Sequence, residues 1–204
     1  MPIRPVFHHL LGPAMLALSV SAAVVLAADP EPAWTFDQHG STYVYTVTVL
    51  SALPTDVLLD VLFQPRHVAA FSKSAGRLAV LKEDGDVNEV RFDTRKFIFT
   101  CSTTFRRAVD REAGSIEIDM TGFKAGWGKL APHARSSRAR YTVTDRGTFR
   151  EVMYRQEVET DKPVAGYSLR SLRKSMAEFA RDLDAYLRRP DLARDASGTP
   201  GVPK

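Results

Sequence analysis

Apolar and polar residues alternate along most of the middle of the chain. Between residues 77 and 121 the alternation has a period of two, which is typical of strands with one face on a core and one in water. Turn-forming residues interrupt it at 84–86, 93–95 and 110–114. We therefore expect an antiparallel meander here, with these side chains on its apolar face: Phe97, Phe99, Cys101, Thr103, Phe105, Ile116, Ile118 and Met120.

Before the meander, the pattern predicts one strand followed by two short helices. Residues 41–51 are almost all tyrosine, threonine and valine, which fit a pleated, half-buried surface. Pro54 can open a helix, and apolar residues follow it at spacings of three and four up to Phe63. Pro65 interrupts this helix and begins a second one that reaches Phe71.

After the meander, periodicity is absent between residues 122 and 137, a glycine-containing segment that we predict to be a long loop. Strands are expected over 138–144 and 148–159, joined by a tight turn. The last element is an amphipathic helix from Ser168 to about Arg189, roughly 30 Å long. Its apolar side chains recur every three or four residues: Leu169, Leu172, Met176, Phe179, Leu183 and Leu187.

The N-terminus has the pattern of an export signal. Residues 10–26 are apolar or small, and the segment ends in small residues suited to cleavage after Ala27 or Ala28. We expect residues 1–27 to be a cleavable signal peptide and the protein to be periplasmic or secreted. The alternative is an uncleaved membrane anchor. We expect residues 28–40 to be an extended spacer and 190–204 to be a disordered tail.

Composition narrows the class of protein further. A formal net charge of +4 over 204 residues, without a basic block, does not favour nucleic-acid binding. The single cysteine, Cys101, excludes an intrachain disulfide. Its apolar neighbours favour a small buried core residue over a nucleophile. The chain length after cleavage suits one domain with its own core.

The order of these elements resembles the helix-grip fold of the START-like and Bet v 1-like superfamily (SRPBCC). The most specific similarity is residues 51–62, followed by Pro65 and Phe71, which are similar to the strand-to-helix entry of bacterial polyketide cyclase and lipid-transport relatives. Leu58 departs from that pattern, since many relatives carry an aromatic residue there. The resemblance covers residues 41–189 and implies an α+β fold: a curved antiparallel sheet wrapped around a long C-terminal helix, with two short helices after the first strand.

A curved sheet with a helix across it can leave a space between the two layers. Methionine and aromatic side chains suit an irregular apolar ligand in that space. The same side chains at the same periods would also build a filled core, and both interpretations stay open. The candidate ligand-binding residues are Phe97, Phe99, Phe105, Met120, Trp127, Tyr141, Tyr154, Met176 and Phe179. Trp127 and Phe123 lie among glycines where a lid could hinge.

Motifs for other chemistry are missing from the sequence. The histidines lack metal-ligand spacing, and there is neither a nucleophile elbow nor a phosphate-binding glycine loop. We therefore predict no metal, no cofactor and no assigned catalytic residue. For a cyclase-type enzyme, the plausible polar groups are Arg107, His133 and Tyr154. Arg107 shares the phase of Phe105, but the favoured interpretations are a surface arginine at a strand end for Arg107 and an ordinary loop residue for His133.

Three functional hypotheses follow from the sequence. The first is an exported binding or carrier protein for a lipid-like or other apolar small molecule, held between sheet and C-terminal helix. The second is a cyclase or hydratase acting on an apolar substrate. The third is a filled domain that contacts an envelope protein or, transiently, a membrane, through an exposed apolar patch around Trp127. The oligomeric state stays open.

Overall fold

The computed structural model describes residues 31–96, 99–125, 133–164 and 166–192, without the side chains of residues 74, 96, 99 and 166–168. The predicted signal peptide lies outside the described residues. Among the described helices, none combines the length and apolarity that crossing a membrane requires. The elements in chain order are β1 (Ala33–His39), β2 (Thr42–Ser51), α1 (Thr55–Phe63), α2 (Pro65–Phe71), η1 (Lys73–Ala75), β3 (Arg77–Asp84), β4 (Val87–Lys96), β5 (Phe99–Asp110), β6 (Ser115–Ala125), β7 (Ala134–Asp145), β8 (Arg150–Thr160) and α3 (Gly166–Leu187).

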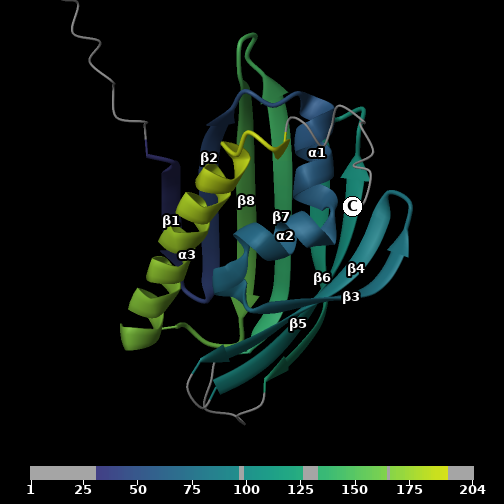
Figure 1. Cartoon of the computed structure of the whole chain (residues 1–204). Coiled ribbons are helices and arrows are strands. Elements are labelled where there is room, and N and C mark those ends of the chain that lie inside the picture. The colour runs from purple at the N-terminus through teal and green to yellow at the C-terminus, as the bar shows by residue number, and fades with distance from the viewer. Residues whose placement is uncertain (1–30, 97–98, 126–132, 165, 193–204) are drawn as a thin grey trace, which may run out of the picture. The chain divides into compact units, whose positions relative to one another are not determined.

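All the strands form one antiparallel sheet of eight strands in the order β1-β2-β8-β7-β6-β5-β4-β3. β2 therefore pairs with both β1 and the last strand, β8, and the meander from β3 to β8 completes the sheet. Figure 1 shows that β3, β4 and β5 bend across the lower part of the view, so the sheet curves around the side that carries the helices. A β-bulge interrupts the register between Val80 and Lys82 on the edge strand β3.

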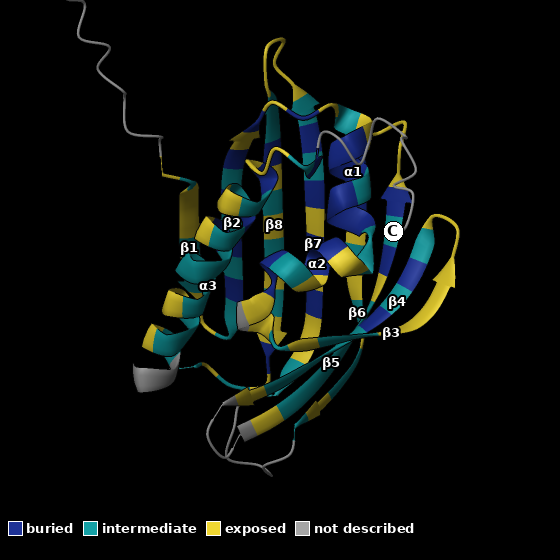
Figure 2. Ribbon diagram, in the orientation of Figure 1, coloured by how far each residue is buried: buried dark blue, intermediate teal, exposed yellow. Residues whose placement is uncertain are grey.

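The helices divide the inner face of the sheet between them. α3 packs on β1, β2, α2 and η1, whereas α1 packs on β5, β6 and β7. The buried residues lie between these helices and the sheet (Figure 2). Leu58 and Leu62 of α1 are fully buried there, as are Leu183 of α3 and Val152 of β8. The core therefore fills the part of the sheet that the helices cover.

The predicted α+β arrangement, with two short helices after a strand and a long C-terminal helix, is confirmed. The interpretation of residues 28–40 as a spacer was wrong, because β1 occupies part of them. Trp34 and Phe36 of β1 pack against Tyr45 and Tyr43 of β2, with ring centroids 6.4 Å and 6.0 Å apart. β1 is an edge strand with one face mostly in water, and such a strand has only a weak apolar pattern.

Further expectations need correction. The turn predicted at 93–95 lies within β4, and the loop predicted over 122–137 is shorter, because β6 runs to Ala125 and β7 begins at Ala134. Phe123 therefore lies on a strand and not on a hinged lid.

The disordered tail was expected to begin at residue 190, but Leu192 is buried in the core, because the chain turns back after α3. Cys101 was expected to be a buried core residue, yet it is only half-buried, because it lies near the start of β5, away from the helices that cover the sheet. The remaining residues of the tail lie outside the described part of the chain.

Candidate functional site

The inner face of the sheet keeps apolar side chains that are only partly buried on strands β3 to β6. Strand alternation and register place them on the side of the helices, and each retains some exposed surface. We call this set the inner apolar face: Leu78, Phe92, Phe105, Ile118, Met120 and Phe123. The rings of Phe92 and Phe105 meet edge-on with centroids 6.1 Å apart. Because removing apolar surface from water is favourable, this half-covered face can bind an apolar ligand.

Three buried or half-buried tyrosines follow on the neighbouring strands. Tyr141 and Tyr154 lie directly opposite each other on β7 and β8, with ring centroids 4.7 Å apart. Tyr154 also contacts Phe179 of α3 at 5.2 Å. The hydroxyl of Tyr45 donates a hydrogen bond to the backbone oxygen of Met176 at 2.5 Å. These contacts join the sheet to α3, and we call Tyr45, Tyr141 and Tyr154 the tyrosine cluster.

Arg107 lies on β5, between the inner apolar face and the tyrosine cluster. Its side chain points inward, on the same face of β5 as Phe105, and the residue is only 2% exposed, so the interpretation of Arg107 as a surface arginine at a strand end was wrong. The guanidinium donates to the backbone oxygens of Leu62 and Phe63 at the C-terminus of α1. It also lies 5.5 Å from the centre of the Phe63 ring. Arg107 therefore holds the end of α1 against the sheet.

Burial governs the protonation of these groups. Burial lowers the pKa of Arg107 to about 10, and nearby Tyr141 and Tyr154 act in the opposite direction. Burial also raises the pKa of Tyr45, Tyr141 and Tyr154 above the ordinary tyrosine value. The site thus presents a cation and neutral phenols at physiological pH.

Tyr154 nevertheless retains accessible side-chain surface. Its ring contacts those of Tyr141 and Phe179, which cover part of it.

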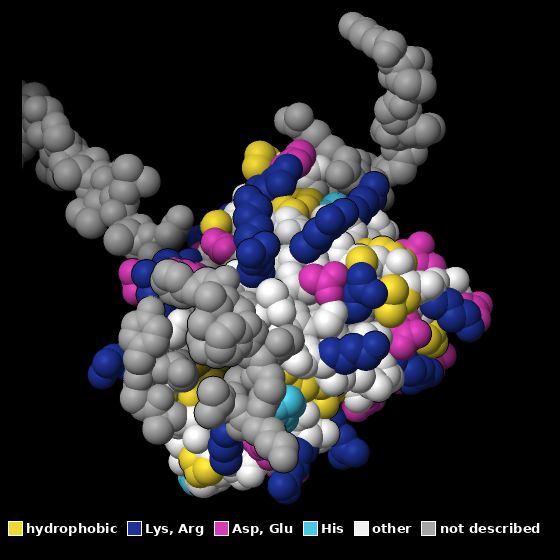
Figure 3. Space-filling model, turned by 90° about the horizontal axis from the view of Figure 1, so that it is seen from below, with side chains coloured by type: hydrophobic (Ala, Val, Ile, Leu, Met, Phe, Trp, Pro, Cys, Tyr) yellow, Lys and Arg dark blue, Asp and Glu magenta, His cyan; other side chains and the backbone are white. Residues whose placement is uncertain are grey.

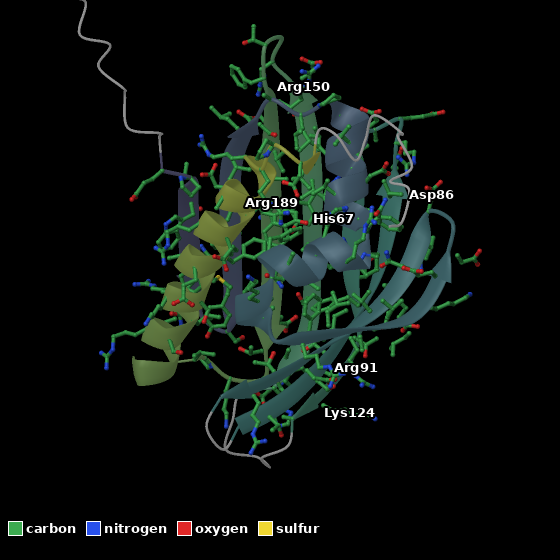
Figure 4. The ribbon with its side chains drawn as sticks, in the orientation of Figure 1. His67, Asp86, Arg91, Lys124, Arg150 and Arg189 are labelled. Atoms are coloured by element: carbon green, nitrogen blue, oxygen red, sulfur yellow. The ribbon has the colours of Figure 1, made fainter. Side chains whose placement is uncertain are left out.

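A separate pocket of about 450 Å³ lies at the ends of β4, β5 and β6. It is lined by Asp93, Thr94, Arg95, Thr100, Cys101, Ser102, Lys124 and Ala125. Figure 4 labels Lys124 and Arg91 at this lower end of the sheet. The hydroxyl of Ser102 donates to Asp93, and this bond, followed by that from Arg91, lowers the pKa of Asp93. Seen from below, Lys and Arg side chains are interspersed with Asp and Glu (Figure 3).

The candidate ligand-binding residues separate into two groups in the structure. Tyr141, Tyr154, Met176 and Phe179 come together between the sheet and α3. Phe105 and Met120 are opposite each other on β5 and β6, within the inner apolar face. Phe97, Trp127 and the side chain of Phe99 lie outside the described residues. α3 packs on the β1–β2 side of the sheet, so Met176 and Phe179 lie with the tyrosines, whereas Phe105 and Met120 lie further along the sheet.

The three polar candidates for an enzyme are also placed differently. Arg107 and Tyr154 are close enough for their charges to affect each other's pKa. His133 instead meets the Phe123 ring edge-on at 5.9 Å, and its backbone N–H donates to Asp161 at 2.8 Å. Across the described ranges, no cluster of three or more His, Cys, Asp or Glu side chains could hold a metal ion.

Sequence reasoning missed Tyr45 and Phe92 as members of the site. Both lie on strands with the same apolar alternation as the candidate ligand-binding residues. The sequence does not show which strands pair with β2 and β4, and this pairing is what brings Tyr45 and Phe92 to the site. Period-two spacing was thus the available signal for Tyr45 and Phe92, but it does not show which strands are neighbours.

The chain matches no family model, and no curated protein matches it in sequence. Its structure is similar to that of the ZhuI aromatase/cyclase from Streptomyces sp. R1128, with a TM-score of 0.58 and 15% identity over 79% of this chain and 99% of that one. The chain has the helix-grip fold. Other helix-grip proteins are similar too, among them a START superfamily protein from Mycobacterium smegmatis (TM-score 0.55, 13% identity, 71% of this chain and 96% of that one).

A STAR-related lipid transfer protein from Xanthomonas axonopodis is similar over 76% of this chain and 99% of that one, with a TM-score of 0.52 and 13% identity. At these identities the likeness shows the helix-grip fold alone, which agrees with the predicted α+β class. The inner apolar face and the tyrosine cluster lie on the inward side of the helix-grip sheet. A shared fold does not imply a shared function, so the function depends on these side chains.

Proposed function

We propose that this helix-grip protein binds an apolar, lipid-like small molecule on the inner face of its sheet and carries it without chemical change. The observation that supports this most directly is the inner apolar face, whose members all keep exposed surface although they point toward the core side. A core that had been closed by packing would bury them, because protein interiors are packed to the density of organic crystals.

The names of the similar structures are consistent with this proposal. One is described as a lipid transfer protein and another as an aromatase/cyclase, and both act on or carry small molecules by name. No nucleophile motif and no metal-ligand spacing is present in the sequence. A binding or carrier role therefore agrees better with the sequence, because it requires no catalytic motif.

The test compares two methionines on opposite faces of the sheet. Met120 is half-buried on the inner apolar face, whereas Met153 of β8 is 37% exposed on the outer face. With an apolar fluorescent probe, we expect Met120→Lys to weaken binding at least about tenfold, because the ligand would have to desolvate a charge. Met153→Lys should leave the affinity unchanged.

Thermal unfolding of both variants serves as the control for folding. Native mass spectrometry of protein purified from its own host, followed by organic extraction, should in addition reveal a stoichiometric apolar molecule. A wild-type protein that takes up no apolar probe and yields no extractable molecule would overturn the proposal.

We also propose that the protein is exported and that residues 1–27 are removed. The apolar segment of residues 10–26 supports this, and cleavage after Ala27 or Ala28 leaves every described residue in the mature chain. The mass of the protein recovered from the envelope and from the medium tests both the cleavage site and the compartment. A full-length mass in the cytoplasmic fraction would contradict export.

A further inference from the structure

Arg107 is a buried cation without a carboxylate partner in the described part of the chain. Its guanidinium makes two hydrogen bonds, both to backbone oxygens of α1. None of the ion pairs among the described residues includes it. A guanidinium has five N–H donors, so three N–H groups are left over. Buried charges are normally paired, and Arg107 therefore lacks an anion.

The hydroxyl groups of Tyr141 and Tyr154, beside Arg107, also lack hydrogen-bond partners in the described part of the chain. Within the described ranges, the structure gives neither the Tyr141 nor the Tyr154 hydroxyl a hydrogen bond, whereas the Tyr45 hydroxyl binds the backbone oxygen of Met176. A buried tyrosine hydroxyl usually has a partner. Arg107 lies near enough to both rings for its charge to lower their pKa, although burial has the larger, opposite effect. One cation and two hydroxyl groups thus gather in one region of the inner face.

The strand register shows how this region joins the inner apolar face. Arg107 of β5 pairs with Ile118 of β6, which pairs with Ala139 of β7. Tyr141 follows Ala139 on the same face of β7, two residues further along. Ile118 belongs to the inner apolar face, and Ala139 beside it is a small residue with no side chain beyond Cβ. The polar region therefore lies directly at the end of the apolar one.

We propose that the ligand is an acidic amphiphile whose carboxylate binds between the Arg107 guanidinium and the hydroxyls of Tyr141 and Tyr154. Its apolar part then lies along the inner apolar face, starting at Ile118. This inference rests on the proposed function and adds the chemical class of the ligand. A carboxylate accepts hydrogen bonds from both kinds of donor and supplies the negative charge that Arg107 lacks.

The experiment uses a naturally fluorescent polyene fatty acid and its methyl ester as probes of equal apolar length. We expect wild-type protein to bind the acid at least about tenfold more tightly than the ester, because the ester lacks the charged carboxylate that accepts these hydrogen bonds. The double variant Tyr141→Phe/Tyr154→Phe removes only two hydroxyls and leaves the bonds from Arg107 to α1 in place. It should reduce the preference for the acid to about threefold or less, with the affinity for the ester unchanged.

The outcomes separate this inference from the proposed function. Equal binding of acid and ester by the wild-type protein overturns the inference and leaves the proposed function standing. A preference that survives intact in the double variant also overturns it. Failure of both probes to bind overturns the inference, and if no apolar molecule can be extracted from the purified protein either, it overturns the proposed function as well. Arg107→Gln, with exposed Arg106→Gln as its matched control, should abolish the preference wherever the variant folds.

Discussion

The Nη1 atom of Arg107 lies 2.7 Å from the backbone oxygen of Phe63. Through this bond, a side chain of β5 holds the last residue of α1. Arg107 also binds the oxygen of Leu62, and Asn88 of β4 donates to the Phe63 oxygen at 3.2 Å. The final carbonyls of a helix lack partners within the helix, and a cation there is favoured by the helix dipole. The strands β4 and β5 therefore cap α1.

Replacing the capping arginine should destabilise the fold. Arg107→Met removes both hydrogen bonds and leaves the Leu62 oxygen buried without a donor, and we expect a loss of about 2 kcal/mol in the free energy of unfolding. Chemical denaturation measures it. Arg106→Met, at the exposed neighbouring position, should change the stability by less than about 0.5 kcal/mol. An Arg107→Met variant as stable as the wild type would show that relief from burying the charge offsets the lost bonds.

The tyrosine cluster should make the protein sensitive to alkali. Burial raises the pKa of Tyr45, Tyr141 and Tyr154, so the unfolded chain loses these protons at about pH 10 while the folded protein keeps them. Their contribution to stability is present below about pH 10 and is lost as the pH rises through the folded-state values.

The pKa of Arg107 is lowered to about 10, so Arg107 makes the stability rise with pH where the tyrosines make it fall. It is one group against three, and the tyrosines should dominate. Absorbance of ionised phenol should therefore rise in two stages, the second coinciding with loss of circular dichroism. A single reversible stage that includes all tyrosines before unfolding would contradict the prediction. Tyr141→Phe/Tyr154→Phe should shrink the second stage.

Gly76 should tolerate no side chain. It follows η1 at a φ of +110°, and a Cβ atom there would lie 2.5 Å from the backbone oxygen of Asp93. We expect Gly76→Ala to cost more than about 2 kcal/mol, since the backbone of β4 would have to move. Gly85 has a φ of +57° with open space around it, so Gly85→Ala should cost only about 1 kcal/mol. Equal losses from both variants in thermal or chemical unfolding would argue against a close approach at Gly76.

Leu192 should contribute to stability although it lies beyond α3. It is 2% exposed and belongs to the core, so Leu192→Ala should lower the free energy of unfolding by about 2 to 3 kcal/mol. The matched control is Leu81→Ala, because Leu81 is 48% exposed on β3 and its loss should cost less than about 0.5 kcal/mol. Equal stability of the two variants would place the end of the folded domain before residue 192.

The sequence predicted the parts of the fold whose periodicity is strong. The apolar spacing of α3 and the alternation of β5 and β6 are set by local geometry, so these elements could be recognised without knowledge of their neighbours. β1 could not be recognised, because it is an edge strand with a weak apolar pattern. The burial of Leu192 could not be predicted either, because Leu192 is a single apolar residue after a proline. Their burial depends on distant residues such as Tyr45, which no local pattern shows.

For the site, the sequence identified Tyr141, Tyr154 and Phe179 from their phases, and the structure brings them together. Arg107 was selected only as a polar candidate for an enzyme, and a surface position was favoured for it, which its burial contradicts. Its bonds to the end of α1 could not be predicted, because residues 62 and 107 are far apart in the chain and meet only through the sheet curvature. The separation of Phe105 and Met120 from Met176 depends on the path of α3, which periodicity does not determine.

The bulge between Val80 and Lys82 has a consequence for the protein at high concentration. β3 is the last strand on its side of the sheet, so its outward backbone groups have no neighbouring strand within the fold. A straight strand there would be a template for a second molecule to add its own strand. The extra residue, Leu81, breaks the even spacing of donors and acceptors, and the charged residues at the end of the strand, Lys82 to Asp84, would have to lose water if a second strand paired there. We therefore expect the irregularity at this edge to disfavour pairing between the β3 strands of two molecules.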